Sequence, residues 1–134
     1  MNISKFTQKS VQAVQDLEKV AYEYGNQEVE QEHLLYALLT QEDSLILKLI
    51  EKMEINKDYF INTVKKALDA KVKVSGGDLR FGQYLNKSLV NAENEAKAMG
   101  DEYVSVEHLF LSLLTQPSPS MKKIFNEFGI TRER

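Results

Sequence analysis

The sequence predicts an all-α protein made of two similar helical repeats, because one long segment occurs twice. Residues Ala21–Gln41 recur as Ala96–Gln116, 75 positions later, with 10 of 21 positions identical. Each copy runs from a Glu-His pair into an apolar stretch, Leu34–Leu39 in the first and Leu109–Leu114 in the second. A helix that is apolar on all sides belongs inside a protein, and about ten residues are too few to cross a bilayer. We therefore predict two central, buried helices.

The composition is that of an ordinary globular domain. The chain has 134 residues, of which 43% are hydrophobic and 28% charged, a formal net charge of −3 and no cysteine. The lack of cysteine excludes disulfides, thiol chemistry and zinc sites of the Cys type. Lys and Arg are scattered, without the basic footprint of nucleic-acid binding, and no signal pattern or membrane-length apolar run is present. We expect one domain, residues 1–134, in the cytoplasm, with no nucleic-acid or membrane partner.

The helices of the first repeat are predicted from the spacing of apolar residues and from helix caps. Ser4 or Thr7 can cap a first helix, and Gly25 ends it. The first central helix is expected over residues 31–40, a third begins after the caps at 42–44, and a fourth begins at Asn56. The residues predicted to face inward are Phe6, Ser10, Ala13, Val14, Leu17, Ala21 and Tyr24, then Leu45, Ile46, Leu49, Ile50 and Met53, then Phe60, Val64, Ala67 and Leu68.

The second repeat replays this plan but stops early. Repeat one covers residues 1–70, and the connector 71–80 combines an alternating Lys-Val-Lys-Val with Ser-Gly-Gly-Asp, which predicts a mobile link with a short extended piece. Repeat two covers 81–134, and Pro117 and Pro119 flank the turn before its third helix. The last match pairs Asn56 with Thr131, both good helix caps, so the fourth helix of repeat two is missing. We expect residues 132–134 to begin that helix in a longer polypeptide.

The repeated Glu-His pair has two interpretations. His33 and His108 could join a metal or acid–base site, but the HExxH spacing of metallopeptidases is absent and a zinc site needs at least three converging ligands. Alternatively, each His lies in the first turn of a central helix and bonds neighbouring backbone. No phosphate-binding GxxxxGK[ST] loop and no Ser-His-Asp set is present. We expect a non-catalytic chain without a metal or cofactor of its own.

Two glutamates stand out at the same place in both repeats. Glu32 and Glu107 lie in the first turns of the central helices, where a carboxylate complements the helix dipole. Ser105 can cap the second of these helices, whereas its counterpart Glu30 is a weaker cap. The two repeats therefore resemble each other in the core and differ at the surface.

These residues are similar to a known family, the Clp N-terminal repeat domains. The resemblance rests on the doubled Glu-His-Leu, on Gly-Asp-Glu-Tyr-Val-Ser-Val at 100–106, on Phe-Thr-Gln-Lys at 6–9, and on Phe-Gly-Ile-Thr-Arg-Glu at 128–133. With Val-Ser-Gly-Gly in the connector, it is closest to the ClpB-type disaggregases. It implies two pseudo-twofold-related four-helix repeats, here with the last helix truncated, that bind unfolded or aggregated polypeptide as a monomeric domain. It also implies a longer hexameric parent with AAA+ modules that use ATP and Mg and with a DnaK-type chaperone as partner.

The resemblance carries four candidate substrate-binding residues to this chain. The polar ones are Thr7, Asp101 and Glu107, and Leu89 is the expected apolar wall of the same groove. Asn91 and His108 stand where some relatives have leucine.

Two alternative functions stay open. The ClpC-type domains, also similar, bind adaptor proteins and phosphoarginine, and the motif places Glu32 and Glu107 in that role. A helix N-terminus attracts phosphate and a carboxylate pairs with a guanidinium, but Glu30 adds a negative charge and the usual Gly-Thr before Glu-His is missing. The other alternative is a free-standing adaptor that consists of this domain alone.

Overall fold

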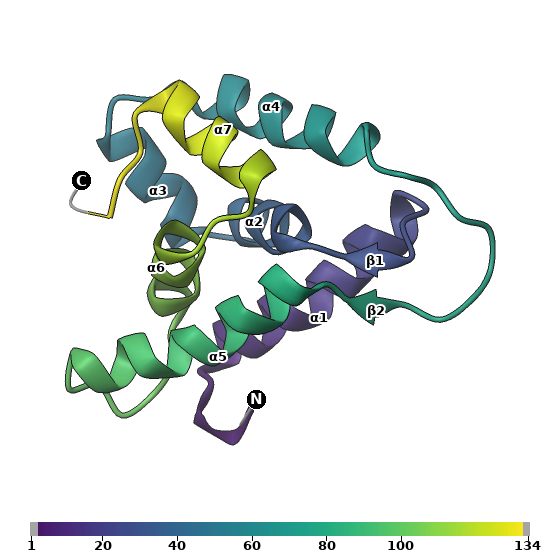
Figure 1. Ribbon diagram of the computed structural model, residues 1–134. Helices are drawn as coiled ribbons and strands as arrows, with labels where there is room; N and C mark the ends of the chain where they lie inside the picture. Colours follow the sequence, from purple (N-terminus) through teal and green to yellow (C-terminus); the bar gives the residue numbers. More distant parts are fainter. Residues whose placement is uncertain (1–2, 133–134) are drawn as a thin grey trace.

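The computed structural model describes residues 3–132 as a bundle of helices (Figure 1). The elements in this part of the chain are a 3-10 turn at Ile3–Lys5, the helices α1 (Gln8–Glu23), α2 (Gln31–Leu39), α3 (Leu45–Lys52), α4 (Lys57–Asp69), α5 (Gln83–Ala98), α6 (Val106–Thr115) and α7 (Pro119–Phe128), and the two-residue strands β1 (Glu28–Val29) and β2 (Arg80–Phe81). Within this range, no helix combines the length and apolar character that a membrane span requires. The prediction of an all-α fold is confirmed.

The two central helices lie in the middle of the molecule, as predicted (Figure 1). Helix α2 packs against α1, α3, α4, α5 and α6, and α6 packs against α1, α2, α3 and α5. Leu34, Leu35 and Leu38 of α2, and Leu109 and Leu113 of α6, are all fully buried. They belong to one hydrophobic core that both repeats share.

The two repeats complete each other's backbone pairing. In repeat one, Val29 pairs in parallel with Phe81 of repeat two, and the Gly82 N–H donates to the Val29 carbonyl over 2.8 Å. The same contact recurs with the roles exchanged, because Phe6 pairs in parallel with Val104 and the Thr7 N–H donates to the Val104 carbonyl over 3.0 Å. The 75-residue offset carries one contact onto the other, as a pseudo-twofold axis requires.

A buried glutamine joins the repeats where the symmetry breaks. Gln31, 1% exposed, donates from Nε2 to the Ser88 hydroxyl (2.8 Å) and to the Gln116 carbonyl (2.9 Å). Its Oε1 accepts from the Ser118 N–H at 2.8 Å. Its counterpart is Val106, so this three-bond link exists only once.

Most predicted helix boundaries agree with the structure. Thr7, Ser44 and Asn56 cap α1, α3 and α4 by accepting from backbone N–H groups of the first turn, and Gly25, at φ 72°, follows the end of α1. One detail was wrong, because Leu45 begins α3 on the solvent side and is 40% exposed. The short extended piece expected in the connector lies at its end, where Arg80–Phe81 forms β2.

The repeats differ in what covers their central helices. Helix α4 packs on α2 and α7, and Phe60 of α4 meets Phe128 edge-on with ring centroids 4.9 Å apart. Among the described residues no counterpart of α4 follows α7, so Leu111 and Leu114 of α6 are only partly buried. A further helix after Thr131 stays a prediction, and Glu133 and Arg134, where it would begin, lie outside the described residues.

One strained position gives a testable prediction about stability. Glu54 follows the end of α3 with φ 63°, whereas its counterpart after α7 is Gly129 with φ 65°. Both positions close the same helix-ending turn, in which the next N–H donates to Ile50 O or Phe125 O. Because a Cβ is disfavoured at positive φ, Glu54→Gly is expected to raise the free energy of unfolding by about 0.5–1 kcal/mol in urea denaturation. Gly129→Ala is the reverse control, and a stabilised Gly129→Ala would contradict this explanation.

Candidate functional site

The first histidine completes the start of a central helix. Glu30 N–H donates to His33 Nδ1 over 2.8 Å, which leaves the proton on Nε2, 2.9 Å from the Asn26 side-chain oxygen. The Asn26 amide then donates to the Val72 carbonyl of the connector at 3.0 Å. Burial, followed in size by the nearby Lys71 ammonium, lowers the pKa of His33 to about 4.

The second histidine repeats the arrangement with one change. Ser105 N–H donates to His108 Nδ1 over 2.9 Å, and His108 Nε2 lies 2.8 Å from Asp101 Oδ2. Asp101 therefore stands where repeat one has Asn26. The interpretation in which each His lies in a first turn and bonds neighbouring backbone is confirmed. Among the described residues, no group of three or more His, Cys, Asp and Glu side chains is placed to hold a metal ion.

The two glutamates that occupy the same position in each repeat have opposite surroundings. Glu32 is 1% exposed and is bound by Lys71 (3.4 Å) and by the Ser120 hydroxyl (2.5 Å). Glu107 is exposed, with the Ser105 hydroxyl 3.5 Å away. Of the two predicted phosphoarginine-binding carboxylates, only Glu107 is thus open to a ligand in this structure.

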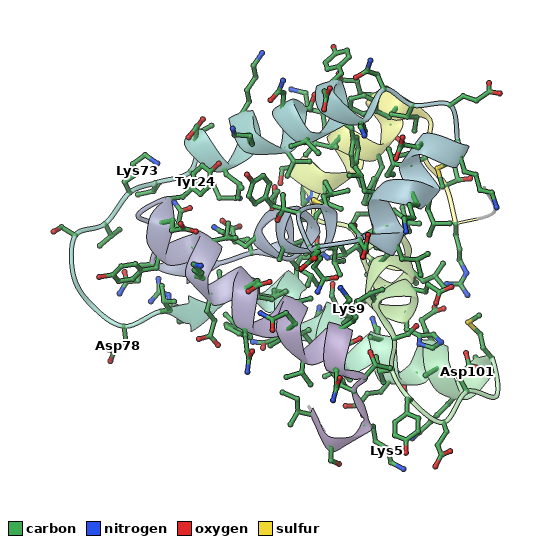
Figure 2. All side chains as sticks on the ribbon, turned by 180° about the vertical axis from the view of Figure 1, so that it is seen from behind. Lys5, Lys9, Tyr24, Lys73, Asp78 and Asp101 are labelled. Atoms are coloured by element: carbon green, nitrogen blue, oxygen red, sulfur yellow. The ribbon has the colours of Figure 1, made fainter. Side chains whose placement is uncertain are left out.

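The structure gathers the three predicted polar site residues around one loop. Residues 101–105 lead into α6, with Asp101 at the start of this loop and Glu107 just after it. Thr7 borders the same loop from the other repeat, since its N–H donates to Val104 O and its neighbour Ser10 donates to the same carbonyl at 2.8 Å. Asp101 lies at the outer edge of the molecule (Figure 2).

Leu89 does not join this group at the surface. It is 2% exposed and belongs to the hydrophobic core, because the face of α5 that carries it packs inward. Its side chain therefore has no surface to offer as the wall of a groove. The large apolar side chains that are exposed in this region are Val90 (51%), Met99 (56%) and Tyr103 (51%), and Asn91 is bonded to Gln116 over 2.6 Å.

An apolar groove of about 170 Å³ lies beside Glu107, between α3 and α6. Its lining is mostly aliphatic and consists of Leu49, Met53, Met99, Glu107, Phe110, Leu111, Leu114 and Arg132. The 75-residue offset relates this lining to Tyr24, Glu32, Leu35, Tyr36, Leu39, Lys57, Ile124 and Phe128. In repeat one that surface is covered, since Phe128 packs edge-on against Phe60 of α4 and Glu32 is paired with Lys71. The groove is therefore the repeat-two counterpart of the surface on which α4 packs, and among the described residues no helix covers it.

Two features of this region were not anticipated from the sequence. Lys71, whose side chain is 13% exposed, closes the repeat-one copy of the site by binding Glu30 at 2.9 Å and Glu32 at 3.4 Å. Met99 and Tyr103 supply apolar surface on the open copy. The sequence did contain a signal for Met99 and Tyr103, because the 75-residue offset aligns them with Tyr24 and Glu28 at the corresponding place in repeat one. No sequence signal links Lys71 to Glu32, which lies 39 positions earlier in the chain.

Comparison with known proteins places the chain among the Clp domains. Residues 5–128 match the family described as Clp repeat (R) N-terminal domain. The chaperone protein ClpB of Nitratidesulfovibrio vulgaris and that of Clostridium tetani are each 39% identical over the whole chain. The match covers 16% of each relative, so the chain spans about a sixth of the length of these proteins.

Solved structures agree on the fold. The N-terminal domain of Hsp104 from Candida albicans has a TM-score of 0.84 at 22% identity, covering 96% of this chain and 85% of that one. The N-domain of ClpV in complex with a VipB peptide has a TM-score of 0.73 at 22% identity, covering 98% of this chain and 82% of that one. The helical pairing, the shared core and the match over nearly the full length agree, and the chain belongs to the family of Clp repeat N-terminal domains.

Proposed function

We propose that this chain is the substrate-recognition domain of a ClpB-type chaperone and that it binds unfolded or aggregated polypeptide on the open half of repeat two. The observation that carries this proposal is that Thr7, Asp101 and Glu107 gather around one loop, residues 101–105. Met99 and Tyr103, which are 56% and 51% exposed, add apolar surface to the same region. Relatives named ClpB and a ClpV N-domain that holds a peptide support the assignment.

The physical properties of this surface suit weak and promiscuous capture. An apolar side chain gains about 25 cal/mol for each Å² it buries, but ordering an unfolded partner consumes much of that gain. Several copies of such a domain on one hexamer would restore affinity through avidity. We propose that the parent is hexameric and cytoplasmic, that it hands the bound polypeptide to AAA+ modules using ATP and Mg, and that it works with a DnaK-type chaperone.

Titration of the isotope-labelled chain with reduced, carboxymethylated α-lactalbumin tests this proposal by NMR. Chemical-shift changes are expected to cluster at residues 99–107 and at Thr7. The double variant Met99→Ser/Tyr103→Ser removes exposed apolar surface and is expected to weaken binding about tenfold. Tyr22→Ser is the matched control, because Tyr22 is 80% exposed on α1 and lies outside this surface. Absent or uniformly scattered shifts would end the proposal.

The same samples address the ClpC-type alternative. Free phosphoarginine should cause no saturable shifts if the chain is of the ClpB type. Saturable binding that disappears in Glu107→Ala would favour the ClpC-type assignment, because Glu107 is the exposed one of the two candidate carboxylates.

A further inference from the structure

The connector between the repeats has a bound part and a free part. Its first residues, Lys71–Val74, lie along repeat one and contact it, and we term them the strap. The residues that follow are exposed, with Gly76 and Gly77 at φ 77° and 83°. The far end of the connector is fixed again, because the Arg80 N–H donates to the Gln27 carbonyl over 3.0 Å.

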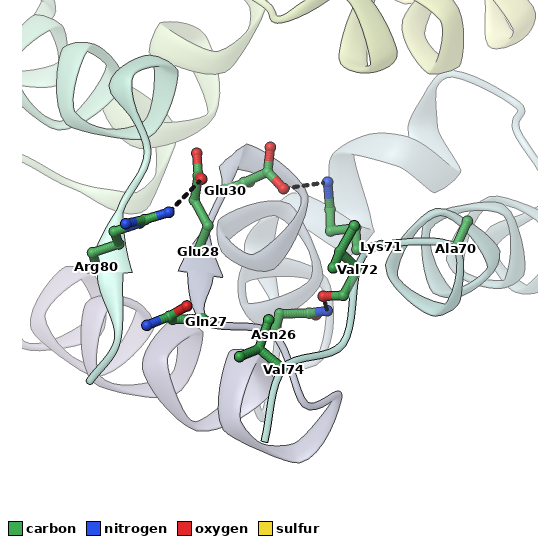
Figure 3. Close-up of a pocket in the computed structure, with 9 residues that line it drawn as sticks. All are labelled: Asn26, Gln27, Glu28, Glu30, Ala70, Lys71, Val72, Val74 and Arg80. Carbon is green, nitrogen blue, oxygen red and sulfur yellow. Dashed lines mark hydrogen bonds and ion pairs between the residues drawn. The ribbon is translucent and has the colours of Figure 1, made fainter. Parts of the chain in front are cut away.

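An ion pair holds the near end of the strap. The Lys71 ammonium lies 2.9 Å from Glu30 Oε2 and 3.4 Å from Glu32 Oε1, and Figure 3 shows Lys71 reaching toward Glu30. The side chain of Glu32 is 2% exposed and that of Lys71 is 13% exposed. Removing two charges from water is costly, and their mutual attraction offsets this cost only while the pair is intact. Closure of the strap therefore depends on the charge of Lys71.

Hydrogen bonds continue along the strap. The Val72 carbonyl accepts from the Asn26 side-chain amide at 3.0 Å, and the Val74 N–H donates to the Gly25 carbonyl over 2.9 Å. Asn26 is 3% exposed in this position. The same short segment thus covers two polar side chains of repeat one, Asn26 and Glu32.

The strap makes little apolar contact with the rest of the domain. Val72 is 80% exposed and Val74 is 43% exposed. A pocket of about 350 Å³, which Arg80 also lines, lies between the strap and residues 26–30 (Figure 3). Segments with few buried apolar contacts have the lowest free energies of local opening. The strap can therefore separate from repeat one without disturbing the hydrophobic core.

We infer that the strap is a releasable cover, which opens locally while α2 and α4 stay folded and which, when closed, withholds the Glu32 carboxylate from solvent and from any partner. Its two ends are fixed outside it, since α4 ends at Asp69 and β2 begins at Arg80. Opening hydrates Glu32, so any change that removes the charge of Lys71 shifts the equilibrium toward the open form. This device belongs to repeat one and does not depend on which polypeptide the domain binds.

Amide hydrogen exchange of the 134-residue chain, followed by NMR at urea concentrations below the unfolding transition, tests for local opening. The Val74 N–H and the Asn26 side-chain amide protons are expected to exchange with the same opening free energy. Urea should leave this free energy nearly unchanged, because local opening exposes little surface. The N–H of Leu35, which is fully buried in α2, should exchange with a free energy that falls as urea increases.

Lys71→Gln tests the ion pair. It is expected to speed exchange at Val74 and at the Asn26 side chain about tenfold, because a charge-assisted contact with two carboxylates is lost. Lys65→Gln is the matched control, since Lys65 is exposed on α4 outside the strap, and it should leave both rates unchanged. Should Lys71→Gln fail to fold because Glu32 is left unpaired, the double variant Lys71→Gln/Glu32→Gln removes that charge. It is expected to fold and to show the same acceleration of about tenfold.

Any of three results would overturn the inference. Exchange at Val74 and Asn26 that accelerates with urea in parallel with Leu35 would show that the strap leaves only on global unfolding. Exchange of Val74 at the rate of an unprotected amide in the natural chain would show that the strap is not closed. Unchanged exchange in Lys71→Gln, or in the double variant, would show that the ion pair does not hold the strap.

Discussion

Replacing Leu39 by alanine is expected to lower the free energy of unfolding by about 3 kcal/mol, whereas Leu114→Ala should lower it by about 1 kcal/mol. The two residues are counterparts at the ends of the central helices. Leu39 is 1% exposed at the end of α2, which α4 covers. Leu114 lines the open groove beside α6 and is only partly buried. Truncation at Leu39 therefore leaves a cavity, whereas truncation at Leu114 removes atoms that already touch solvent.

Urea denaturation of the two variants measures the difference directly, and each residue serves as the control for the other. If both substitutions lowered the free energy of unfolding of the 134-residue chain equally, the result would contradict the partial exposure of Leu114 on α6. The same pair also tests for a further helix after Thr131. In a longer natural chain, where such a helix would cover α6, Leu114→Ala should become as costly as Leu39→Ala.

The second large effect is a loss of stability in acid that depends on His33. The pKa of His33 is lowered to about 4 in the folded chain, first by burial and then by Lys71, from an ordinary value of 6.5. Between these two values the unfolded chain binds a proton that the folded chain does not bind, so stability decreases as the pH falls. The full difference of about 2.5 pKa units corresponds to about 3 kcal/mol, lost between pH 6.5 and pH 4. A proton on His33 Nδ1 would also point at the Glu30 N–H, from which Nδ1 accepts a hydrogen bond at neutral pH, so that this bond would be lost.

His33→Gln is the matched control for this prediction. Glutamine at the third helical position can accept from the cap N–H, as in a capping box, and it does not titrate. Denaturation curves at pH 6.5, 5.5 and 4.5 should therefore show a steeper loss for the natural chain than for His33→Gln. Parallel losses in the two proteins would refute the role of His33, because the other acid-sensitive groups are the same in both.

The sequence predicted the helices well because their signals are local. Caps at Thr7, Ser44 and Asn56, apolar spacing, and a repeat of high identity each depend on residues close in the chain. The strands could not be placed in this way. Arg80–Phe81 is extended because it pairs with Glu28–Val29 of the other repeat, and that pairing is set by the packing of the repeats rather than by the two residues themselves.

The candidate site was predicted only in part, for a similar reason. Thr7, Asp101 and Glu107 do gather around one loop, whereas Leu89 points into the core because the rotation of α5 is fixed by its contacts with α6 and α2. The difference between Glu32 and Glu107 was hidden in the sequence, where both stand in identical Glu-His-Leu motifs. Their exposure differs because Lys71 reaches one of them and the described chain has no equivalent residue beside the other.

The exchanged pairing of Phe6 with Val104 and of Val29 with Phe81 makes the domain equivalent to a homodimer joined by a tether. A single ancestral repeat would contain both partners of this contact, namely the segment before its first helix and the residue before its central helix. In this arrangement, however, each partner pairs only with the other repeat, so a lone repeat would leave both unpaired. Two identical chains would satisfy both contacts at once through an isologous interface. Duplication within one gene then fixes the stoichiometry and releases each half to diverge, so that one buries its carboxylate beneath the tether and the other keeps its carboxylate exposed to solvent.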